Sequence, residues 1–483
     1  MSSVKRNLYW SSILTVSGYL FPLITYPYIT RVLGVDKIGI CNFVDSIINY
    51  GILISMMGMT TLGIREIAQA KDDKKKLSSV FTSLVTLNFI TSLLIILILL
   101  GVTPFVEKFH DYQKLFYIGA AKILFNALMV EWLYTGLENF RFITLRSLIF
   151  KVIYVLSIFA FIKCSEDYVK YFAINTSLII VNSLANILYS KKFVQFSFRN
   201  LHLKNYLVPF FLLGIYMLLT SMYTSFNVAY LGFACGTVEV GYYTTAVKLF
   251  TLILAFITAF TNVMMPRMSS LLAEEKRDDF LRLINKSVDV LMAFVVPMVI
   301  IGFVFSESII RIIAGTGFEG AIIPMRIIMP LLLVIGYEQI LVIQILMPLK
   351  KDKSILVNSV FGALVGLTLN FLIVPLLNSS GSAIVWFSSE LTVLLFSQYY
   401  VSKYISYSFP FIKLIKRLLW AIPAIATCVV LKTYITSYVL SLLGGIVVIC
   451  VYFGILEFFY YKNTFLRVAF DNVRTMINSS RRL

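Results

Sequence analysis

The stretch SSVFTSLVTLNFITSLLIILILLG, residues 78–101, carries no charged side chain. A helix needs roughly 20 mostly apolar residues to cross a bilayer, so this stretch predicts a membrane span. About fourteen such stretches follow one another along the chain. They lie near residues 9–30, 38–63, 78–101, 115–137, 144–163, 168–190, 207–231, 241–265, 288–306, 321–348, 355–377, 382–404, 418–435 and 438–461. Because they are too long and too continuously apolar for barrel strands, we expect an all-α integral membrane protein.

The composition agrees with a bundle of helices in lipid. Hydrophobic residues make up 59% of the chain and charged residues 14%, whereas a soluble domain is about half apolar and a quarter charged. The net charge of +18 comes from basic residues that stand mostly between apolar stretches. We therefore expect membrane lipids as partners and no nucleic acid. Scattered cysteines without a CxxC pair, and only two histidines, predict neither a disulfide framework nor a metal site.

The loop charges predict the orientation in the membrane. Alternate loops of a fourteen-span chain hold 31 Lys and Arg on one side and 9 on the other. Positive loops stay in the cytoplasm, and a missed or extra helix would scramble this alternation. The bias therefore favours an even number of spans with both termini cytoplasmic.

The two halves of the chain resemble each other weakly. The second span opens with Gly39 and ends at Arg65, and the eighth opens with Gly241 and ends at Arg267, so both offsets are 202. Two six-helix lobes in a parallel, pseudo-twofold repeat would follow. We predict an N-lobe over 1–200, a C-lobe over 201–410, two extra spans over 411–461 and a basic amphipathic cytoplasmic tail over 462–483.

Polar residues recur at helical spacing on corresponding helices of the two halves, and two interpretations stay open for them. They could line a central cavity, or they could hydrogen-bond neighbouring helices together. On this basis we assign Asn42, Asn49, Thr244 and Thr251 to a substrate cavity, and we add Asn126 to the same site.

Lys122 and Lys248 lie well inside predicted spans, where charge is costly and usually functional. Lys122 and Lys248 each lie about seven residues from the predicted periplasmic end of their helices, and Asp45 lies at a similar depth. One lysine from each half could meet an anionic headgroup. Alternatively, each lysine is a structural partner of Asp45 or extends to the interface.

Two glutamates lie nearer the predicted midplane, Glu338 in the tenth span and Glu390 in the twelfth. A carboxylate at that depth could bind a coupling proton or Na⁺, and we assign both glutamates, together with Asp45, to a coupling-ion site. They could equally be hydrogen-bonded structural acids.

Four short motifs carry a resemblance to a known family. They are Tyr28-Ile-Thr-Arg-Val-Leu-Gly34, Gly63-Ile-Arg-Glu-Ile-Ala68, Val240-Gly-Tyr-Tyr243 and Met265-Pro-Arg-Met-Ser269. With the fourteen-span layout they resemble the polysaccharide transporters, the O-antigen and capsule flippases of the multidrug/oligosaccharidyl-lipid/polysaccharide exporter superfamily.

The resemblance implies two lobes around a central cavity that opens to either side in turn. It implies that undecaprenyl-diphosphate-linked oligosaccharide is carried from the cytoplasmic to the periplasmic leaflet of the bacterial inner membrane, for O-antigen, capsule or exopolysaccharide synthesis. A proton or Na⁺ gradient would drive the step, with no other cofactor. A polysaccharide polymerase and a chain-length regulator are the partner proteins expected.

Three alternatives stay open. A lipid II flippase shares the fourteen spans, whereas a multidrug and toxin extrusion antiporter usually stops at twelve and favours an acidic cavity. A membrane glycosyltransferase or polymerase belongs to a different class and would favour a large periplasmic loop, which the sequence lacks. No GxxxxGK[ST] loop is present either, so we expect a transporter and not an enzyme.

Overall fold

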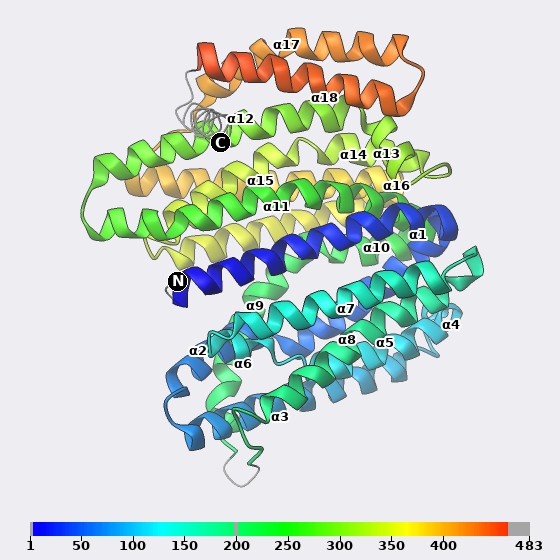
Figure 1. Cartoon of the computed structure of the whole chain (residues 1–483), viewed down its shortest axis with the longest axis vertical. Coiled ribbons are helices and arrows are strands. Elements are labelled where there is room, and N and C mark those ends of the chain that lie inside the picture. Colours follow the sequence, from blue (N-terminus) through cyan, green and yellow to red (C-terminus); the bar gives the residue numbers. More distant parts are fainter. Residues whose placement is uncertain (1–2, 198–200, 462–483) are drawn as a thin grey trace, which may run out of the picture. The chain divides into compact units, whose positions relative to one another are not determined.

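The computed structural model describes residues 3–197 and 201–461, and these residues form helices joined by short connections without any strand (Figure 1). The predicted all-α class is therefore confirmed. The predicted tail over 462–483 lies outside the described residues.

The helices fall into two compact units, and the division lies within one long helix, α11. The first unit contains the chain up to Thr244 with the short segments Ala314–Gly317 and Asn370–Asn378, and the second contains the remainder. The elements up to this division are α1 (Ser3–Met56), α2 (Met59–Ala70), α3 (Lys74–Val102), α4 (Glu107–Asp111), α5 (Gln113–Asn126), α6 (Glu131–Gly136), α7 (Phe140–Phe161), η1 (Ser165–Asp167), α8 (Tyr168–Ser190), α9 (Leu203–Thr224), α10 (Phe226–Cys235) and α11 (Thr237–Ala273).

The elements after α11 include two short π-helices, η4 and η5. In order they are α12 (Arg277–Val304), α13 (Ser306–Ile313), η3 (Glu319–Ala321), α14 (Ile322–Ile328), α15 (Leu331–Gln339), η4 (Ile340–Leu346), α16 (Asp352–Ile405), α17 (Phe411–Tyr434), α18 (Tyr438–Ile455) and η5 (Leu456–Tyr460).

Within the described residues, eleven helical stretches are long and apolar enough to cross a membrane. Two of them each cover two predicted spans, because α1 is kinked at Gly34 and α16 at Asn378. Conversely, the predicted spans 115–137, 207–231 and 321–348 are each divided into shorter helices. The total of fourteen spans stays a prediction.

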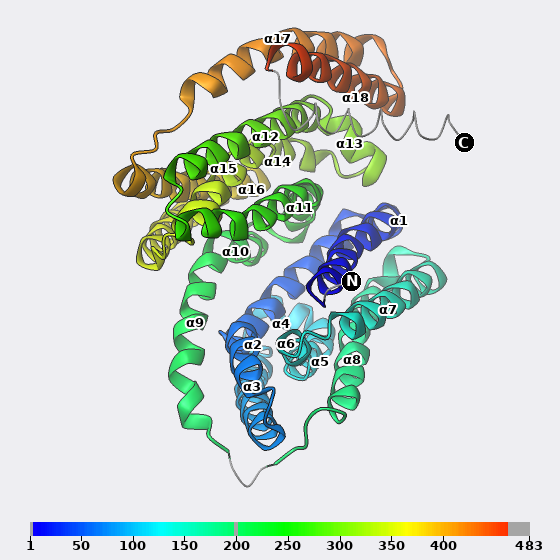
Figure 2. The ribbon, with the colours of Figure 1, turned by 60° about the vertical axis from the view of Figure 1, so that its left-hand side comes forward.

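The α9–α10 segment packs on helices of the first unit. Helix α9 contacts α1, α2 and α3, and α10 contacts α1; Figure 2 shows α9 running beside α2 and α3. The compact first unit therefore extends beyond residue 200. The predicted lobes over 1–200 and 201–410 refer to the internal repeat, and their boundaries stay a prediction.

Helix α3 shows how the sequence produces such an element. Its N-cap Asp73 accepts hydrogen bonds from the backbone N–H groups of Lys75 and Lys76, which satisfies two donors that the first turn leaves free. The first half buries Phe81 and Leu84 in the core of the unit. Towards the other end Leu97 is 68% exposed. An apolar surface of this kind is suited to lipid and costly in water.

Two glycines at equivalent positions of the repeat have the same unusual backbone conformation. Gly34 has φ 74° and ψ 172°, and Gly236, at the same offset of 202, has φ 95° and ψ 174°. This conformation is accessible almost only to glycine, since a side chain would clash with the backbone. Each glycine stands just before a helix segment that opens with Gly39 or Gly241, so the two segments of the repeat begin with the same kink.

Candidate substrate and coupling sites

Lys122, Asp45 and Asn49 form one polar network in the first unit, between α5 and α1. The Lys122 ammonium donates to Asp45 Oδ1 and, at 3.3 Å, to Asn49 Oδ1. Asn49 Nδ2 donates in turn to Asp45 Oδ2 at 3.0 Å. Lys122 is only 8% exposed, whereas Asp45 is half-buried and Asn49 is exposed. The network therefore holds a buried positive charge next to its counter-charge and reaches the surface of the unit through Asn49.

Glycine at the helix contact makes this geometry possible. A Cβ on Gly119 would lie 2.5 Å from Ile48 Cγ1, and a Cβ on Gly51 would lie 2.9 Å from Ile123 Cδ1. Without side chains at these two positions α1 and α5 approach closely, which brings Lys122 within reach of Asp45.

Asn42 and Thr244 also meet in the first unit. Asn42 Nδ2 donates to Thr244 Oγ1 at 2.8 Å, and that hydroxyl donates to the backbone oxygen of Val240 at 2.6 Å. Next to them, a Cβ on Gly39 would lie 1.8 Å from the Thr237 oxygen. Asn42 and Thr244 are repeat-equivalent, and equivalent residues contact each other only close to a twofold axis. The pair is an interhelical hydrogen bond, and a role in lining a cavity stays a prediction.

The remaining candidate headgroup residues are placed separately. Asn126 is half-buried at the end of α5, and its Nδ2 lies 2.6 Å from Met56 Sδ. Lys248 and Thr251 lie on the part of α11 that belongs to the second unit, where Thr251 donates to the Lys248 backbone oxygen at 2.9 Å. The common depth of Lys122 and Lys248 stays a prediction.

The structure brings the two predicted coupling carboxylates together in the second unit. Glu390, on α16, is 6% exposed and accepts a hydrogen bond from Trp386 Nε1 at 3.0 Å. Glu338, near the end of α15, is half-buried and close enough to Glu390 for their charges to interact. Two acids whose charges interact within an apolar bundle favour uptake of a proton or a cation, because two nearby negative charges repel each other.

Neighbouring amides were missed by sequence reasoning. Gln339 Nε2 donates to Thr258 Oγ1 on α11 at 3.0 Å. Gln344 is fully buried, and neither of its side-chain polar atoms has a hydrogen-bond partner. Both lie in or beside the π-helix η4, and π-helical turns are frequent at functional sites. A lone Gln in an apolar stretch could have signalled a buried polar group, but not the π-helical turn that positions it.

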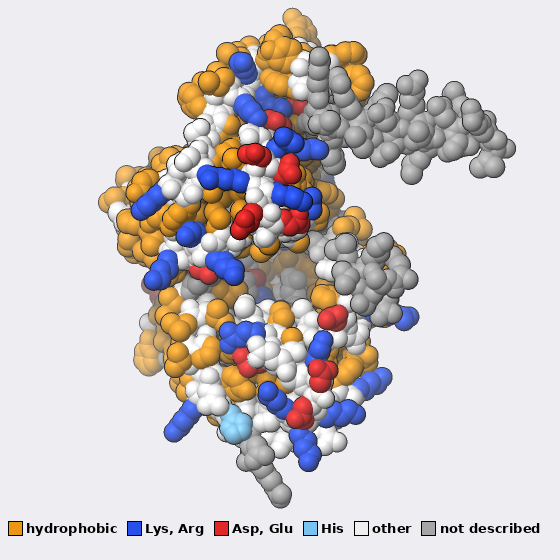
Figure 3. All heavy atoms as spheres, turned by 90° about the vertical axis from the view of Figure 1, so that its left-hand side faces the viewer, with side chains coloured by type: hydrophobic (Ala, Val, Ile, Leu, Met, Phe, Trp, Pro, Cys, Tyr) orange, Lys and Arg blue, Asp and Glu red, His pale blue; other side chains and the backbone are white. Residues whose placement is uncertain are grey.

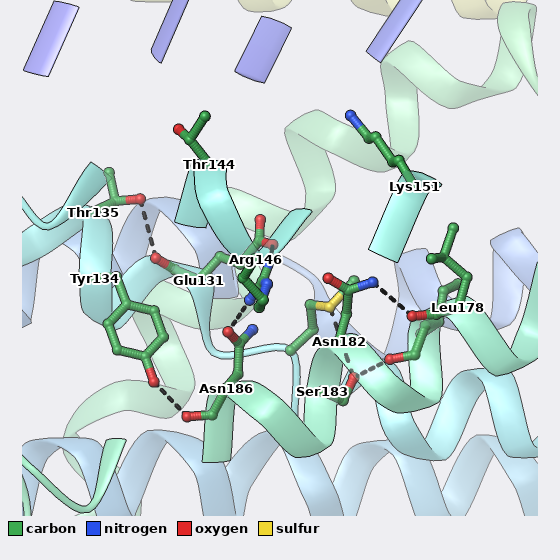
Figure 4. A network of polar contacts seen from close by, with 12 residues as sticks. Glu131, Tyr134, Thr135, Thr144, Arg146, Lys151, Leu178, Asn182, Ser183 and Asn186 are labelled. Atoms are coloured by element: carbon green, nitrogen blue, oxygen red, sulfur yellow. Dashed lines mark hydrogen bonds and ion pairs between the residues drawn. The ribbon is translucent and has the colours of Figure 1, made fainter. Parts of the chain in front are cut away.

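A second buried network was also missed (Figure 4). Loop counting places Arg146 at the membrane surface, but the structure leaves it 6% exposed. Its guanidinium donates to Glu131 Oε1 and to Asn186 Oδ1, and the Tyr134 hydroxyl donates to the Asn186 backbone oxygen. The network joins α6, α7 and α8 of the first unit. Separately, α7 is joined to α1 through Lys151, which donates to Ser17 Oγ at 2.9 Å.

Solved structures with the same arrangement of helices are transporters. A structure of the lipid II flippase MurJ in an inward closed conformation superposes with a TM-score of 0.78, at 14% identity, over 93% of this chain and 98% of that one. An inward-facing multidrug resistance MATE family transporter of the MOP superfamily gives 0.66, at 13% identity, over 80% of this chain and 94% of that one. The fold thus defines the class as a multi-pass helical membrane protein whose helices are arranged as in these two structures.

Sequence relatives define the family within that class. The family described as "Polysaccharide biosynthesis protein" matches residues 4–272, and the chain belongs to it. A protein of Escherichia coli (strain K12) named "Putative O-antigen transporter" is 24% identical over 394 residues, 81% of this chain and 95% of its own length. A protein of Shigella dysenteriae with the same name is 24% identical over 56% of this chain and 68% of its own length. The resemblance predicted from the four motifs is confirmed.

Proposed function

We propose that this chain is a flippase that carries undecaprenyl-diphosphate-linked oligosaccharide from the cytoplasmic to the periplasmic leaflet of the bacterial inner membrane. The observation that carries the proposal is membership of a polysaccharide biosynthesis family together with a transporter fold. The relatives named as O-antigen transporters support an O-antigen, capsule or exopolysaccharide precursor as cargo. Membrane lipids surround the chain, and a polymerase and a chain-length regulator would take up the product.

The physical task is to move a diphosphate through a low-dielectric layer. An isolated charge there costs many kcal/mol, and a fixed positive charge lowers that barrier. We assign this role to Lys122 and Lys248. In the described structure Asp45 neutralises Lys122. An arriving diphosphate would replace Asp45 as the partner of Lys122, and Asp45 would restore the pair after release. The flexible Lys stem favours release over the bidentate grip of an Arg.

A double-mutant cycle tests the headgroup role of Lys122. We expect Lys122→Ala to abolish most surface glycan in a flippase-null strain at normal protein level, and Lys122→Arg to retain part of it. The double variant Asp45→Ala, Lys122→Ala should stay defective, because removing the counter-charge does not replace the cation that the diphosphate needs. Surface polysaccharide and membrane protein level are the two measurements.

The matched control is Lys114→Ala, which removes an exposed lysine from the first turn of the same helix, α5, and should leave export unchanged. Full export by the double variant would mean that Lys122 only neutralises Asp45, and would refute the headgroup role. Adding Lys248→Ala extends the test to the second unit: full export by the Lys122→Ala, Lys248→Ala variant would remove both lysines from the site.

A lipid II flippase is the second candidate, since the MurJ fold extends over 93% of the chain. Both cargoes are diphosphate-linked lipids, so the lysine variants do not separate the two functions. Rescue of a strain depleted of its lipid II flippase, without rescue of a strain lacking its oligosaccharide flippase, would select this candidate.

A further inference from the structure

A basic pocket of about 470 Å³ opens at one end of the first unit, away from the Lys122 network. Its walls are the first two turns of α3 and the segment that follows α8. The lysines that line it are Lys74 and Lys75 on α3, and Lys191 and Lys192 after α8. Four lysines and no carboxylate therefore meet in one described cavity.

The segment after α8 is held in place by hydroxyl groups of α3. The backbone N–H of Gln195 donates to Ser78 Oγ at 3.0 Å, and that of Ser197 donates to Thr82 Oγ1 at 3.1 Å. Val194 is 3% exposed in the core of the unit, and the Phe196 ring packs on Phe81 at 5.4 Å between centroids. Hydrogen bonds and side-chain packing therefore fix the wall of the cavity that follows α8.

The charge around the pocket is mainly positive, and the carboxylate beside the four lysines is that of Asp73, which accepts hydrogen bonds from the backbone N–H groups of Lys75 and Lys76. None of Lys74, Lys75, Lys191 and Lys192 forms an ion pair in the part of the chain that the structure describes, although Lys71 nearby pairs with Glu138. Lys192 instead lies over the Tyr189 ring, 4.8 Å from its centroid. Four like charges around one cavity repel each other, and an anion in the cavity would remove that cost. Figure 3 shows Lys and Arg side chains, with Asp and Glu among them, over the lower part of the view, where the first unit lies.

The surroundings of the pocket point to a lipid as the carrier of that anion. The pocket lies at the first residues of a membrane-spanning helix, α3, on the side that the loop charges predict to be cytoplasmic. Residues 11 and 18 positions after Ser79 share its face of the helix. These are Ile90 and Leu97, which are 50% and 68% exposed. Exposed apolar side chains thus lie on this helix face deeper in the predicted span, beyond residues 80–85, which are buried.

We propose that this pocket binds the headgroup of an anionic phospholipid, with its phosphate among the four lysines and its acyl chains along the exposed face of α3. Basic pockets at the cytoplasmic end of membrane helices suit such headgroups. The site is separate from the flipped cargo, and it ties the connection between α8 and α9 to the membrane surface.

The test measures lipid selectivity of the full-length chain in phosphatidylcholine vesicles with spin-labelled phosphatidylglycerol as the probe. We expect a lower preference for phosphatidylglycerol over phosphatidylcholine in the variant Lys74→Gln, Lys75→Gln, Lys191→Gln, Lys192→Gln. The preference should fall at least about fivefold, which is the effect expected from a single lysine near an anionic surface. The same four positions changed to Arg should keep the selectivity.

The matched control removes four exposed lysines from the same predicted side of the second unit, by Lys350→Gln, Lys353→Gln, Lys403→Gln and Lys416→Gln, and should also keep it. An equal loss in this control would assign the effect to overall charge and overturn the proposal. Unchanged selectivity in the pocket variant would overturn it as well. Binding of soluble pyrophosphate that depends on the four lysines, without any selectivity of the wild-type chain for the phosphatidylglycerol probe, would identify a site for a free anion and would equally refute lipid binding.

Discussion

Buried arginine side chains are held by carboxylates in each unit. Arg146 in the first unit pairs with Glu131, whose side chain is 41% exposed. In the second unit Arg417 on α17 pairs with Glu457 in η5, and the two side chains are only 3% and 2% exposed. Removing one partner of a buried pair leaves an uncompensated charge, which costs more than losing the pair as a whole.

We therefore predict that Glu457→Ala lowers the free energy of unfolding by about 3–5 kcal/mol, whereas Arg417→Met with Glu457→Leu costs much less. The thermal midpoint of the purified chain in one detergent is the measurement. Glu131→Ala is the comparison, with a smaller expected loss because water still reaches Glu131. Equal midpoints for Glu457→Ala and the double variant would show that η5 accommodates the lone arginine.

At the scale of single residues, the sequence predicted which charged side chains are candidates for a site better than it predicted which residues they contact. Lys122 and Asp45 stood out because charges are rare in apolar spans, and their pairing was one of two interpretations. Arg146 did not stand out, because it lies near a span end where arginine usually faces the interface. Its burial depends on Asn186 and Glu131, which lie 40 and 15 residues away along the chain, and no local pattern reports such distant partners.

At the scale of elements, the repeat is clearest at its two kinks. Gly34 and Gly236 share a backbone conformation, and Asp36 and Thr237 beside them are joined by a 2.8 Å hydrogen bond between their side chains. The sequence predicted the repeat from Gly39 and Gly241 but not these kinks, since a glycine can adopt nearly any conformation. Apolar length predicted the spans, whereas the break between α9 and α10 and the π-helix η4 arise from packing that apolar length does not encode.

We predict that Gly34→Ala and Gly236→Ala each destabilise the chain by about 1–3 kcal/mol, because alanine is strained at these dihedral angles. A Cβ added at either position would meet nothing within 4 Å apart from the adjoining backbone, so the loss would report local backbone strain and not a clash with another part of the chain. Thermal midpoints of the single variants measure it.

The matched control for the two kinks is Gly101→Ala, in helix α3, where a Cβ also meets open space but φ is helical. It should be neutral or slightly stabilising, since alanine favours the helix over glycine. Wild-type midpoints for both kink variants would contradict a requirement for glycine there.

At the scale of the whole molecule, the orientation in the membrane rests on the loop charges. We predict that a reporter active only in the periplasm gives no signal when fused after Arg482, because both termini are expected in the cytoplasm. The same reporter inserted after Lys163, between α7 and η1, should be active. A strong signal from the fusion after Arg482 would contradict an even number of spans.

Energy input is the other property of the whole molecule, and we propose that it comes from an ion gradient acting through Glu338 and Glu390. Binding of a proton or Na⁺ would remove the repulsion between the two carboxylates, so occupancy of the pair could bias the carrier between its two access states.

We predict that Glu338→Gln and Glu390→Gln each slow glycan export several-fold and make the remaining export insensitive to collapse of the gradient. Asp352→Asn, which neutralises an exposed acid at the start of the same helix as Glu390, should export normally and stay gradient-dependent. Flipping measured in vesicles with and without an imposed gradient separates the two properties. If both Gln variants export at the wild-type rate and still respond to the gradient, the carboxylate pair is structural and the coupling site lies elsewhere in the chain.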